Sequence, residues 1–261
     1  MVAAWSRSES GRRRARQLLD MDARATAAEA AADADVAVVA VPDDAIRAVA
    51  VEAASGVRPG SIAFHTSGAT SVEALAPLRA AGARTGSLHP LQTLPDPVRG
   101  AEALLGAPVA VTGGPADQES LSSLARGWGG EPFLLPDQSK PVYHAAAVFA
   151  SNYVMAVIHA ATALLDELGL ADPKDLIAPL ARTSVDHALS AEAACSITGP
   201  AARGDVGTLR MHLSALRART TRDDGDGYAD AYLALAALSA GIAGHPPDLV
   251  AEAARRPEVP R

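Results

Sequence analysis

The sequence predicts an α/β domain built on a parallel sheet, followed by an all-helical domain. Three observations carry this prediction. Residues 36–41 read VAVVAV, a continuous apolar run typical of a parallel strand that is covered on both faces. Short apolar runs alternate with helical patterns as far as about residue 135. From residue 136 onward only helical patterns follow.

The elements of the first half follow from this alternation. Each strand-like run is short and apolar, and a longer helical pattern comes after most of them, so the segment is a series of strand–helix–strand units. The expected strands are residues 2–5, 36–41, 61–64, 85–88, 107–112 and 131–135. The expected helices are residues 11–32, 43–54, 71–81 and 116–128.

The second half is expected to be a separate helical domain. Residues 136–141 contain two prolines and form the expected hinge, so we place the domains at residues 1–137 and 138–261. The expected helices are residues 142–168, 172–180, 184–194, 205–219 and 227–243.

Composition limits the classes of function. The chain has 261 residues, is 49% hydrophobic and carries a formal net charge of −7, so it can bury a core and lacks the basic excess of a nucleic-acid-binding protein. A single cysteine, Cys195, excludes an intramolecular disulfide and a cysteine-rich zinc site, and it is expected to be a small buried residue. No metal site is expected, and the expected location is the cytoplasm.

One apolar segment allows a membrane alternative. Residues 145–165 carry no formal charge and are long enough to span a bilayer, but Ser151, Asn152 and His159 are unfavourable in lipid. We expect a helix buried between protein surfaces, with a homodimer interface as one such surface, and no membrane partner.

Polar residues follow three of the predicted strands. Ligands of parallel sheets bind beyond the carboxyl ends of the strands, so these loops are the first candidates for a site. Asp, Ser, Gly and Pro are also ordinary turn residues, which is the alternative for any one loop. Two histidines at the ends of two successive strands favour a ligand site. The three loops are Pro42-Asp43-Asp44, His65-Thr66-Ser67-Gly68 and His89-Pro90-Leu91-Gln92-Thr93.

The first helix of the second half supplies another set. Lys140, His144, Val148 and Asn152 are spaced by four residues, and Ser151 is adjacent to Asn152. On an α-helix this spacing places His144, Val148 and Asn152 on one face. The face could line a cleft between the domains, or the amide and imidazole could be satisfied within a core.

A loop between two later helices offers a cation. Thr198-Gly199-Pro200 is followed by Arg203-Gly204-Asp205, and a guanidinium can bind a carboxylate or a phosphate through two hydrogen bonds. A loop with Asp205 as the N-cap of the next helix explains the pattern equally well.

The glycine-rich turn of a dinucleotide site is missing. No GxGxxG occurs in the sequence, and residues 2–5 resemble the second strand of such a domain. Ser6-Arg7-Ser8 follows them, where an NAD site carries an acidic residue and an NADP site favours Arg and small polar residues. The residues therefore favour NADP over NAD. Either the reading frame starts downstream of its true start, which we prefer, or the protein lacks a pyrophosphate cradle.

Five segments together resemble a known family, and they occur in its order. The chain resembles Rossmann-like NAD(P)-dependent oxidoreductases that end in a helical domain of unknown function 2520, similar to 6-phosphogluconate dehydrogenase, pyrroline-5-carboxylate reductase and ketopantoate reductase-type enzymes. The segments are VPDDAI (41–46), FHTSGA (64–69), SLHPLQT (87–93), YHAAAVFASN (143–152) and TGPAARGD (198–205).

The resemblance implies a Rossmann-like fold, a helical substrate and dimerisation domain, and a set of residue roles. Asn152 and Ser151 would orient a carbonyl, while His144 or Lys140 supplies the proton. The implied substrate-binding residues are His65, His89, Gln92, Arg203 and Thr198. The implied cofactor-binding residues are Ser6, Arg7, Val41, Pro42, Asp43 and Ser67.

The function expected from these observations is that of an NADP-dependent oxidoreductase. It would reduce or oxidise a small oxo or hydroxy acid in a cleft between the domains, in the manner of a ketopantoate reductase. The alternative is a nucleotide-binding regulatory or scaffold protein without turnover, which the missing glycine turn supports.

Overall fold

The computed structural model describes residues 3–32, 34–190, 197–219, 227–246 and 248–255. The chain divides into two compact units, which are unit 1 (Met1–Val154) and unit 2 (Met155–Arg261). Cys195 lies outside the described residues.

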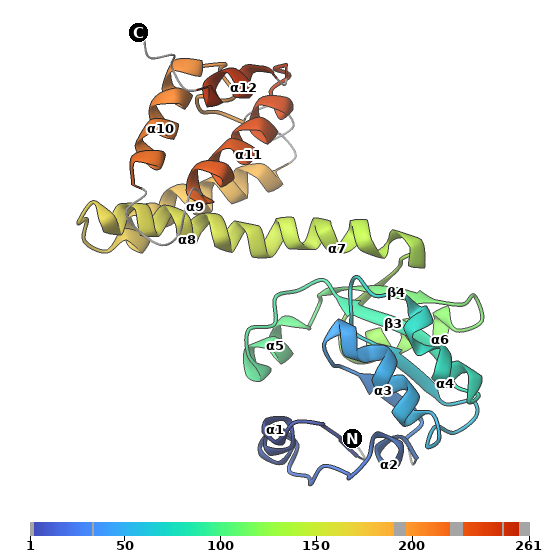
Figure 1. Ribbon diagram of the computed structural model, residues 1–261. Helices are drawn as coiled ribbons and strands as arrows, with labels where there is room; N and C mark the ends of the chain where they lie inside the picture. Colours follow the sequence, from blue (N-terminus) through green and yellow to red (C-terminus); the bar gives the residue numbers. More distant parts are fainter. Residues whose placement is uncertain (1–2, 33, 191–196, 220–226, 247, 256–261) are drawn as a thin grey trace. The chain divides into compact units, whose positions relative to one another are not determined.

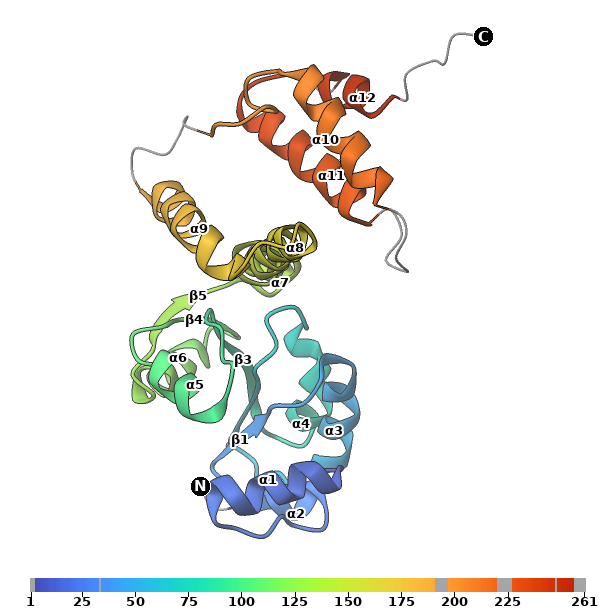
Figure 2. The ribbon, with the colours of Figure 1, turned by 90° about the vertical axis from the view of Figure 1, so that its left-hand side faces the viewer.

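Unit 1 contains a five-stranded sheet in the order β1-β2-β3-β4-β5 (Figures 1 and 2). Its strands pair in parallel at β1–β2, β2–β3 and β4–β5, so the predicted α/β class with a mainly parallel sheet is confirmed. The strands are β1 (Val36–Val39), β2 (Ile62–His65), β3 (Arg84–Pro90), β4 (Pro108–Gly113) and β5 (Glu131–Leu134).

One strand pair corrects the prediction of a wholly parallel sheet, because β3 and β4 are antiparallel. The connection between them contains only the short helix α5 (Pro97–Ala103), which the sequence did not predict. The chain therefore returns from the end of β3 to the start of β4 at the same end of the two strands. There, Leu91 N donates to Pro108 O at 2.8 Å.

Helices cover both faces of this sheet. Adjacent residues of β2 point to opposite faces: Ala63 packs in a core with Ile46 and Leu78, whereas Phe64 packs in a second core with Leu121. The first core involves α3 (Ile46–Ala53) and α4 (Ala76–Ala80), and the second involves α6 (Gln118–Gly127). This coverage explains why the central strands β2 and β4 are apolar at successive positions, whereas β1 and β5 at the edges keep exposed residues.

The N-terminal segment differs from its prediction in two ways. Ala3, Ala4 and Trp5 form no strand. In the described part of the sheet, β1 is an outer strand that pairs with β2 alone. The helix predicted for residues 11–32 is two helices, α1 (Glu9–Leu19) and α2 (Ala27–Ala32). Asp20 ends α1 in a left-handed conformation with φ 51°, which breaks the helix.

A long helix leaves the sheet after the 3₁₀ turn η3 (Asp137–Ser139). It comprises α7 (Lys140–Val148), the π-helical segment η4 (Phe149–Tyr153) and α8 (Val154–Glu167). Only Lys140 is buried along these three segments in the single chain, and the burial of this helix between protein surfaces, with a homodimer interface as one such surface, stays a prediction. By length and composition alone, this helix could cross a membrane, and none of its most apolar 18-residue window is buried.

Unit 2 is helical throughout its described residues, as predicted. It contains α9 (Pro173–Leu189), α10 (Val206–Ala218), α11 (Gly227–Ile242) and α12 (Asp248–Ala254) in addition to α8. The two helices predicted across residues 172–194 are instead the single helix α9, which carries Pro179 within it. Leu209 and Leu213 of α10 pack with Ala236 of α11 and Ala253 of α12 to form the core of this unit.

Candidate functional site

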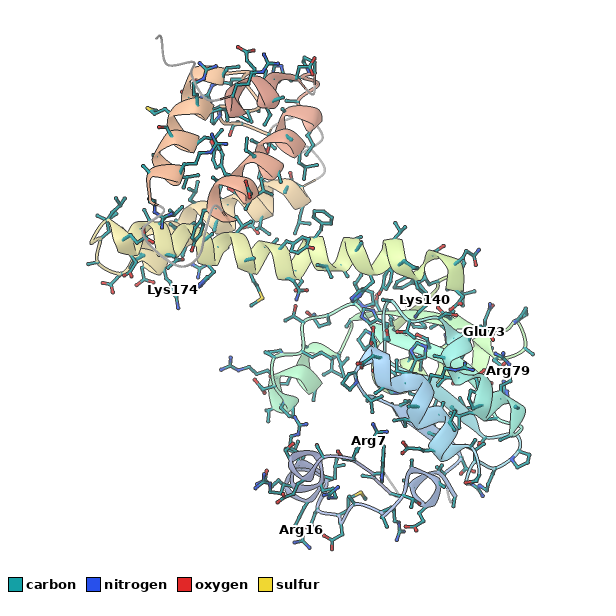
Figure 3. The ribbon with its side chains drawn as sticks, in the orientation of Figure 1. Arg7, Arg16, Glu73, Arg79, Lys140 and Lys174 are labelled. Carbon is teal, nitrogen blue, oxygen red and sulfur yellow. The ribbon has the colours of Figure 1, made fainter. Side chains whose placement is uncertain are left out.

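Lys140 stands at the start of α7 and is 1% exposed (Figure 3). Its Nζ donates to the carbonyl oxygen of Ser67 at 2.9 Å and to Ser87 Oγ at 2.7 Å. Burial lowers the pKa of Lys140 to about 8, against the opposing effects of Asp137 and Asp43. The side chain therefore ties the start of α7 to the loop after β2 and to the middle of β3.

Two aspartates complete this junction. Asp137 accepts from Ser71 Oγ at 2.5 Å and from Val72 N at 2.9 Å. Asp43, in the loop after β1, accepts from Ser67 Oγ at 2.8 Å. The hydrogen bond between Ser67 and Asp43 thus joins the loops that follow β1 and β2, two of the three loops that the sequence marked as candidates for a ligand site.

His65 ends β2 and is completely buried. Ser67 N donates to its Nδ1 at 3.2 Å, so the neutral ring carries its proton on Nε2. Burial, and after it the charge of Lys140, lower the pKa of His65 to about 4. His65 is therefore neutral at physiological pH, and its buried Nε2 has no hydrogen-bond partner among the described residues.

Two further histidines meet above Gly68. A Cβ placed on Gly68 would lie 2.7 Å from Nδ1 of His144 and 2.8 Å from Nε2 of His89, closer than real side chains approach. The two rings are nearly perpendicular, with centroids 5.8 Å apart. His144 Nδ1 is buried and has no hydrogen-bond partner among the described residues, and the two rings pack so closely on Gly68 that only a residue without a Cβ fits there.

Tyr143 holds the other side of the His89 ring. Its hydroxyl lies 2.8 Å from His89 Nδ1, and the rings meet edge to face with centroids 5.5 Å apart. Burial raises the pKa of Tyr143 to about 12, and burial, His144 and Lys140 lower that of His89 to about 4. Both groups are therefore neutral at physiological pH.

The structure gathers six of the predicted site residues within unit 1: Lys140, His144, His65, His89, Ser67 and Asp43. It adds four that the sequence reasoning missed: Tyr143, Gly68, Ser87 and Asp137. Tyr143 and Gly68 stood beside predicted residues, so the motifs YHAAAVFASN and FHTSGA already contained the signal.

Asn152 is not brought into this cluster. The prediction placed it on one α-helical face with His144, but residues Phe149–Tyr153 are π-helical. A π turn takes one more residue than an α turn, so it rotates the following positions away from that face. Asn152 is exposed, while Ser151 Oγ lies 2.9 Å from Thr93 Oγ1 in the loop after β3.

The remaining predicted substrate residues lie apart from the histidines. Gln92 is exposed, and its side chain accepts from the backbone of Thr93 at 2.8 Å. Arg203 and Thr198 are exposed residues of unit 2, and their roles in substrate binding stay predictions. Asp205 caps α10 by accepting from Thr208 N at 2.9 Å, so the capped-loop alternative is confirmed for that residue.

The predicted cofactor residues of the N-terminal segment form an exposed polar group. Arg7 pairs with Glu52 at 2.6 Å, and the two side chains are 63% and 44% exposed. Arg12 donates to the carbonyl oxygens of Ser6 and Arg7. An exposed ion pair contributes only about 0–1 kcal/mol, so a phosphate could replace Glu52 as the partner of Arg7.

The described residues fit one part of NADP. Ser6 and Arg7 suit the ribose phosphate, whereas the position that a Cβ would take on Gly68 is already occupied by the imidazoles of His89 and His144. Val41 and Pro42 lie in the turn after β1, next to Asp43. No glycine-rich turn for the pyrophosphate occurs in the sequence, and no group of three or more metal-binding side chains occurs among the described residues.

Comparison with known protein families gives two matches. A Rossmann-like domain matches residues 1–90, and a domain of unknown function, DUF2520, matches residues 107–238, which is half of the chain. No curated protein matches the chain.

Several solved structures are similar in fold. A proposed NADP oxidoreductase from Bacteroides fragilis is 22% identical with a TM-score of 0.75, covering 92% of this chain and 88% of its own. An imine reductase from Streptomyces aurantiacus is 18% identical with a TM-score of 0.62, covering 97% and 90%. A reductive aminase from Aspergillus terreus, in complex with NADPH and ethyl levulinate, is 20% identical with a TM-score of 0.56, covering 96% and 89%.

Proposed function

The chain belongs to the family of proteins that carry the domain of unknown function DUF2520, here behind a Rossmann-like domain, and from this premise we propose that it is an NADP-dependent oxidoreductase. The proposed reaction is the reduction of a small carbonyl compound, with a small oxo acid of the kind used by ketopantoate reductases as the first substrate class. The proposed setting is the cytoplasm.

The observation that carries this proposal is the meeting of His89 Nε2 and His144 Nδ1 over Gly68. Reduction of a carbonyl develops negative charge on its oxygen, and that oxygen needs a hydrogen-bond donor that is already in place. A neutral imidazole N–H, such as that of His89, can serve as such a donor. In this proposal the carbonyl oxygen binds between the two rings, beside Gly68.

Lys140 supports the same chemistry without touching the substrate. Its pKa of about 8 leaves it mostly protonated at neutral pH, and its charge contributes to the low pKa values of His65 and His89. A buried cation beside the reacting oxygen stabilises developing negative charge because the surroundings screen it weakly. We assign Lys140 this electrostatic role because its Nζ is already committed to Ser67 and Ser87.

The cofactor assignment rests on the N-terminal segment and on the similar structures. Ser6 and Arg7 would hold the ribose phosphate, with the turn at Val41 and Pro42 against the dinucleotide, and bound NADPH would supply the hydride. The similar reductive aminase is in complex with NADPH and a keto ester, which supports this cofactor and a small carbonyl substrate. The similar imine reductase makes carbon–nitrogen double bonds the second substrate class to examine.

The proposal is tested by following NADPH oxidation with a panel of small oxo acids, keto esters and ketone–amine pairs. We expect turnover in the parent and a loss of about 100-fold or more in His89→Gln. The matched control is His159→Gln, because His159 is an exposed histidine of α8 that should leave the rate unchanged. NADPH binding without turnover across the panel would instead support the regulatory or scaffold alternative.

A further inference from the structure

Tyr143 contacts the His89 ring on the side opposite Gly68. Its hydroxyl lies 2.8 Å from Nδ1, while Nε2 of the same ring packs against Gly68, 2.8 Å from the position that a Cβ would take there. The ring therefore lies between a phenol and the position proposed for the substrate oxygen. The contact spans 54 residues of sequence, so it depends on the packing of α7 against the end of β3.

The chemistry of the two groups sets the direction of this hydrogen bond. A neutral phenol is a stronger acid than a neutral imidazole N–H, and an imidazole nitrogen is a better acceptor than a phenol oxygen. Tyr143 therefore donates to Nδ1, and the neutral His89 must carry its own proton on Nε2. The donor of His89 is thus on the side of the ring that lies next to Gly68 and His144, where the proposed function places the substrate oxygen.

We infer that Tyr143 is a positioning residue that holds His89 as the Nε2–H tautomer and relays its own proton through His89 to the substrate. This role rests on the proposed function, in which His89 contacts the reacting oxygen. In the step, the Nε2–H bond breaks and the proton joins the alkoxide. At the same time the O–H bond of Tyr143 breaks and an Nδ1–H bond forms, which leaves a phenolate.

The relay is downhill because an alcohol is a weaker acid than a phenol, even with the pKa of Tyr143 raised to about 12 by burial. Without Tyr143, donation from the neutral ring would leave an imidazolate, a much stronger base than the phenolate. The resting state returns when Nε2 takes a proton from water and Nδ1 gives its proton back to the phenolate.

A packing role is the competing explanation for Tyr143. Its ring also meets Phe133 edge to face, with centroids 6.1 Å apart, so the side chain contributes to the contact between α7 and β5. In that case removal of the hydroxyl would lower stability and leave the chemistry of His89 unchanged. Tyr143→Phe keeps the ring and removes only the hydroxyl, so it separates the two explanations.

The test uses the full-length protein, Tyr143→Phe and the control Tyr153→Phe. Tyr153 lies in the same long helix and is 51% exposed, so its hydroxyl should not matter. Nitrogen-15 NMR of histidine-labelled protein without cofactor should show protonated Nε2 and accepting Nδ1 for His89 in the parent and in Tyr153→Phe. Tyr143→Phe should show a mixture of tautomers.

Turnover measurements complete the test. We expect Tyr143→Phe to lower kcat by about 10- to 100-fold, with KM and the Kd for NADPH within about twofold of the parent. Protonated Nδ1 in the parent, or an unchanged kcat with a lowered Tm, would overturn the inference. Absence of turnover in the parent would remove the proposed function and the relay together, while the NMR result still decides the tautomer.

Discussion

Lys140 Nζ lies 2.7 Å from Ser87 Oγ, which joins the first residue of α7 to the middle of β3. Because the same ammonium group also donates to the Ser67 carbonyl, one buried cation holds two strand-end regions and a helix start together. The adjacent helical residues Tyr143 and His144 are thereby held close to His89 and Gly68. The arrangement of the candidate site depends on this junction.

The first prediction concerns the stability cost of the buried lysine. The pKa of Lys140 is lowered from 10.5 to about 8, so between these values the unfolded chain binds more protons than the folded chain. The free energy of unfolding should therefore rise with pH from about 8 to about 10.5, by about 3 kcal/mol. Urea unfolding across this range should show the rise in the parent and lack it in Lys140→Met. Equal pH profiles for the two proteins would contradict the prediction.

The second prediction concerns Gly68. In Gly68→Ala the new Cβ would collide with His144 Nδ1 and His89 Nε2, so the two rings must separate. We expect a loss of about 1–3 kcal/mol in the free energy of unfolding and a lower kcat per folded molecule. Gly127→Ala is the control, because nothing lies within 4 Å of a Cβ added there. A fully active and stable Gly68→Ala would show that neither stability nor turnover depends on the close packing of the two rings against Gly68.

The third prediction concerns cofactor preference. Among the described residues, the Arg7 guanidinium pairs with Glu52 in an exposed ion pair, which a ribose phosphate could replace. We expect the parent to bind NADPH more tightly than NADH, and Arg7→Asp to shift the preference towards NADH. Titration of both cofactors by fluorescence measures this. Arg16→Asp is the control, since Arg16 forms a similar exposed pair with Asp22 further along α1. Equal affinity of the parent for NADPH and NADH would refute the assignment.

The fourth prediction concerns the exposed apolar helix of α7, η4 and α8. Phe149 and Met155 are 57% and 64% exposed, and side chains of this kind are expected to be covered by another protein surface. We expect a homodimer in buffer without detergent, measured by light scattering, and dissociation in Met155→Glu. Val98→Glu is the control, since Val98 is 69% exposed on α5. Recovery of native protein only from detergent-extracted membranes would favour the membrane alternative.

The sequence by itself determined those elements that a short run of neighbouring residues specifies. The run VAVVAV predicted β1 because a continuous apolar run is typical of a strand in a parallel sheet, although Val36 and Val38 are exposed in the structure. The polar residues at the ends of β2 and β3 could be located in the same way, since His65 and His89 lie at these strand ends and Ser67 follows β2. The helical second half was equally readable, because helical periodicity recurs every few residues.

Only the tertiary structure decided which of these residues meet. The antiparallel return of β4 depends on backbone hydrogen bonds between strands, which no local pattern encodes. The π turn that moves Asn152 away from the face of His144 is a departure from α-helical backbone geometry, which the residue spacing does not encode. The contact of Tyr143 with His89 and the burial of Lys140 join residues more than 50 positions apart. Hydrogen bonding and burial depend on which groups are close in three dimensions, and this proximity is set only when the chain folds.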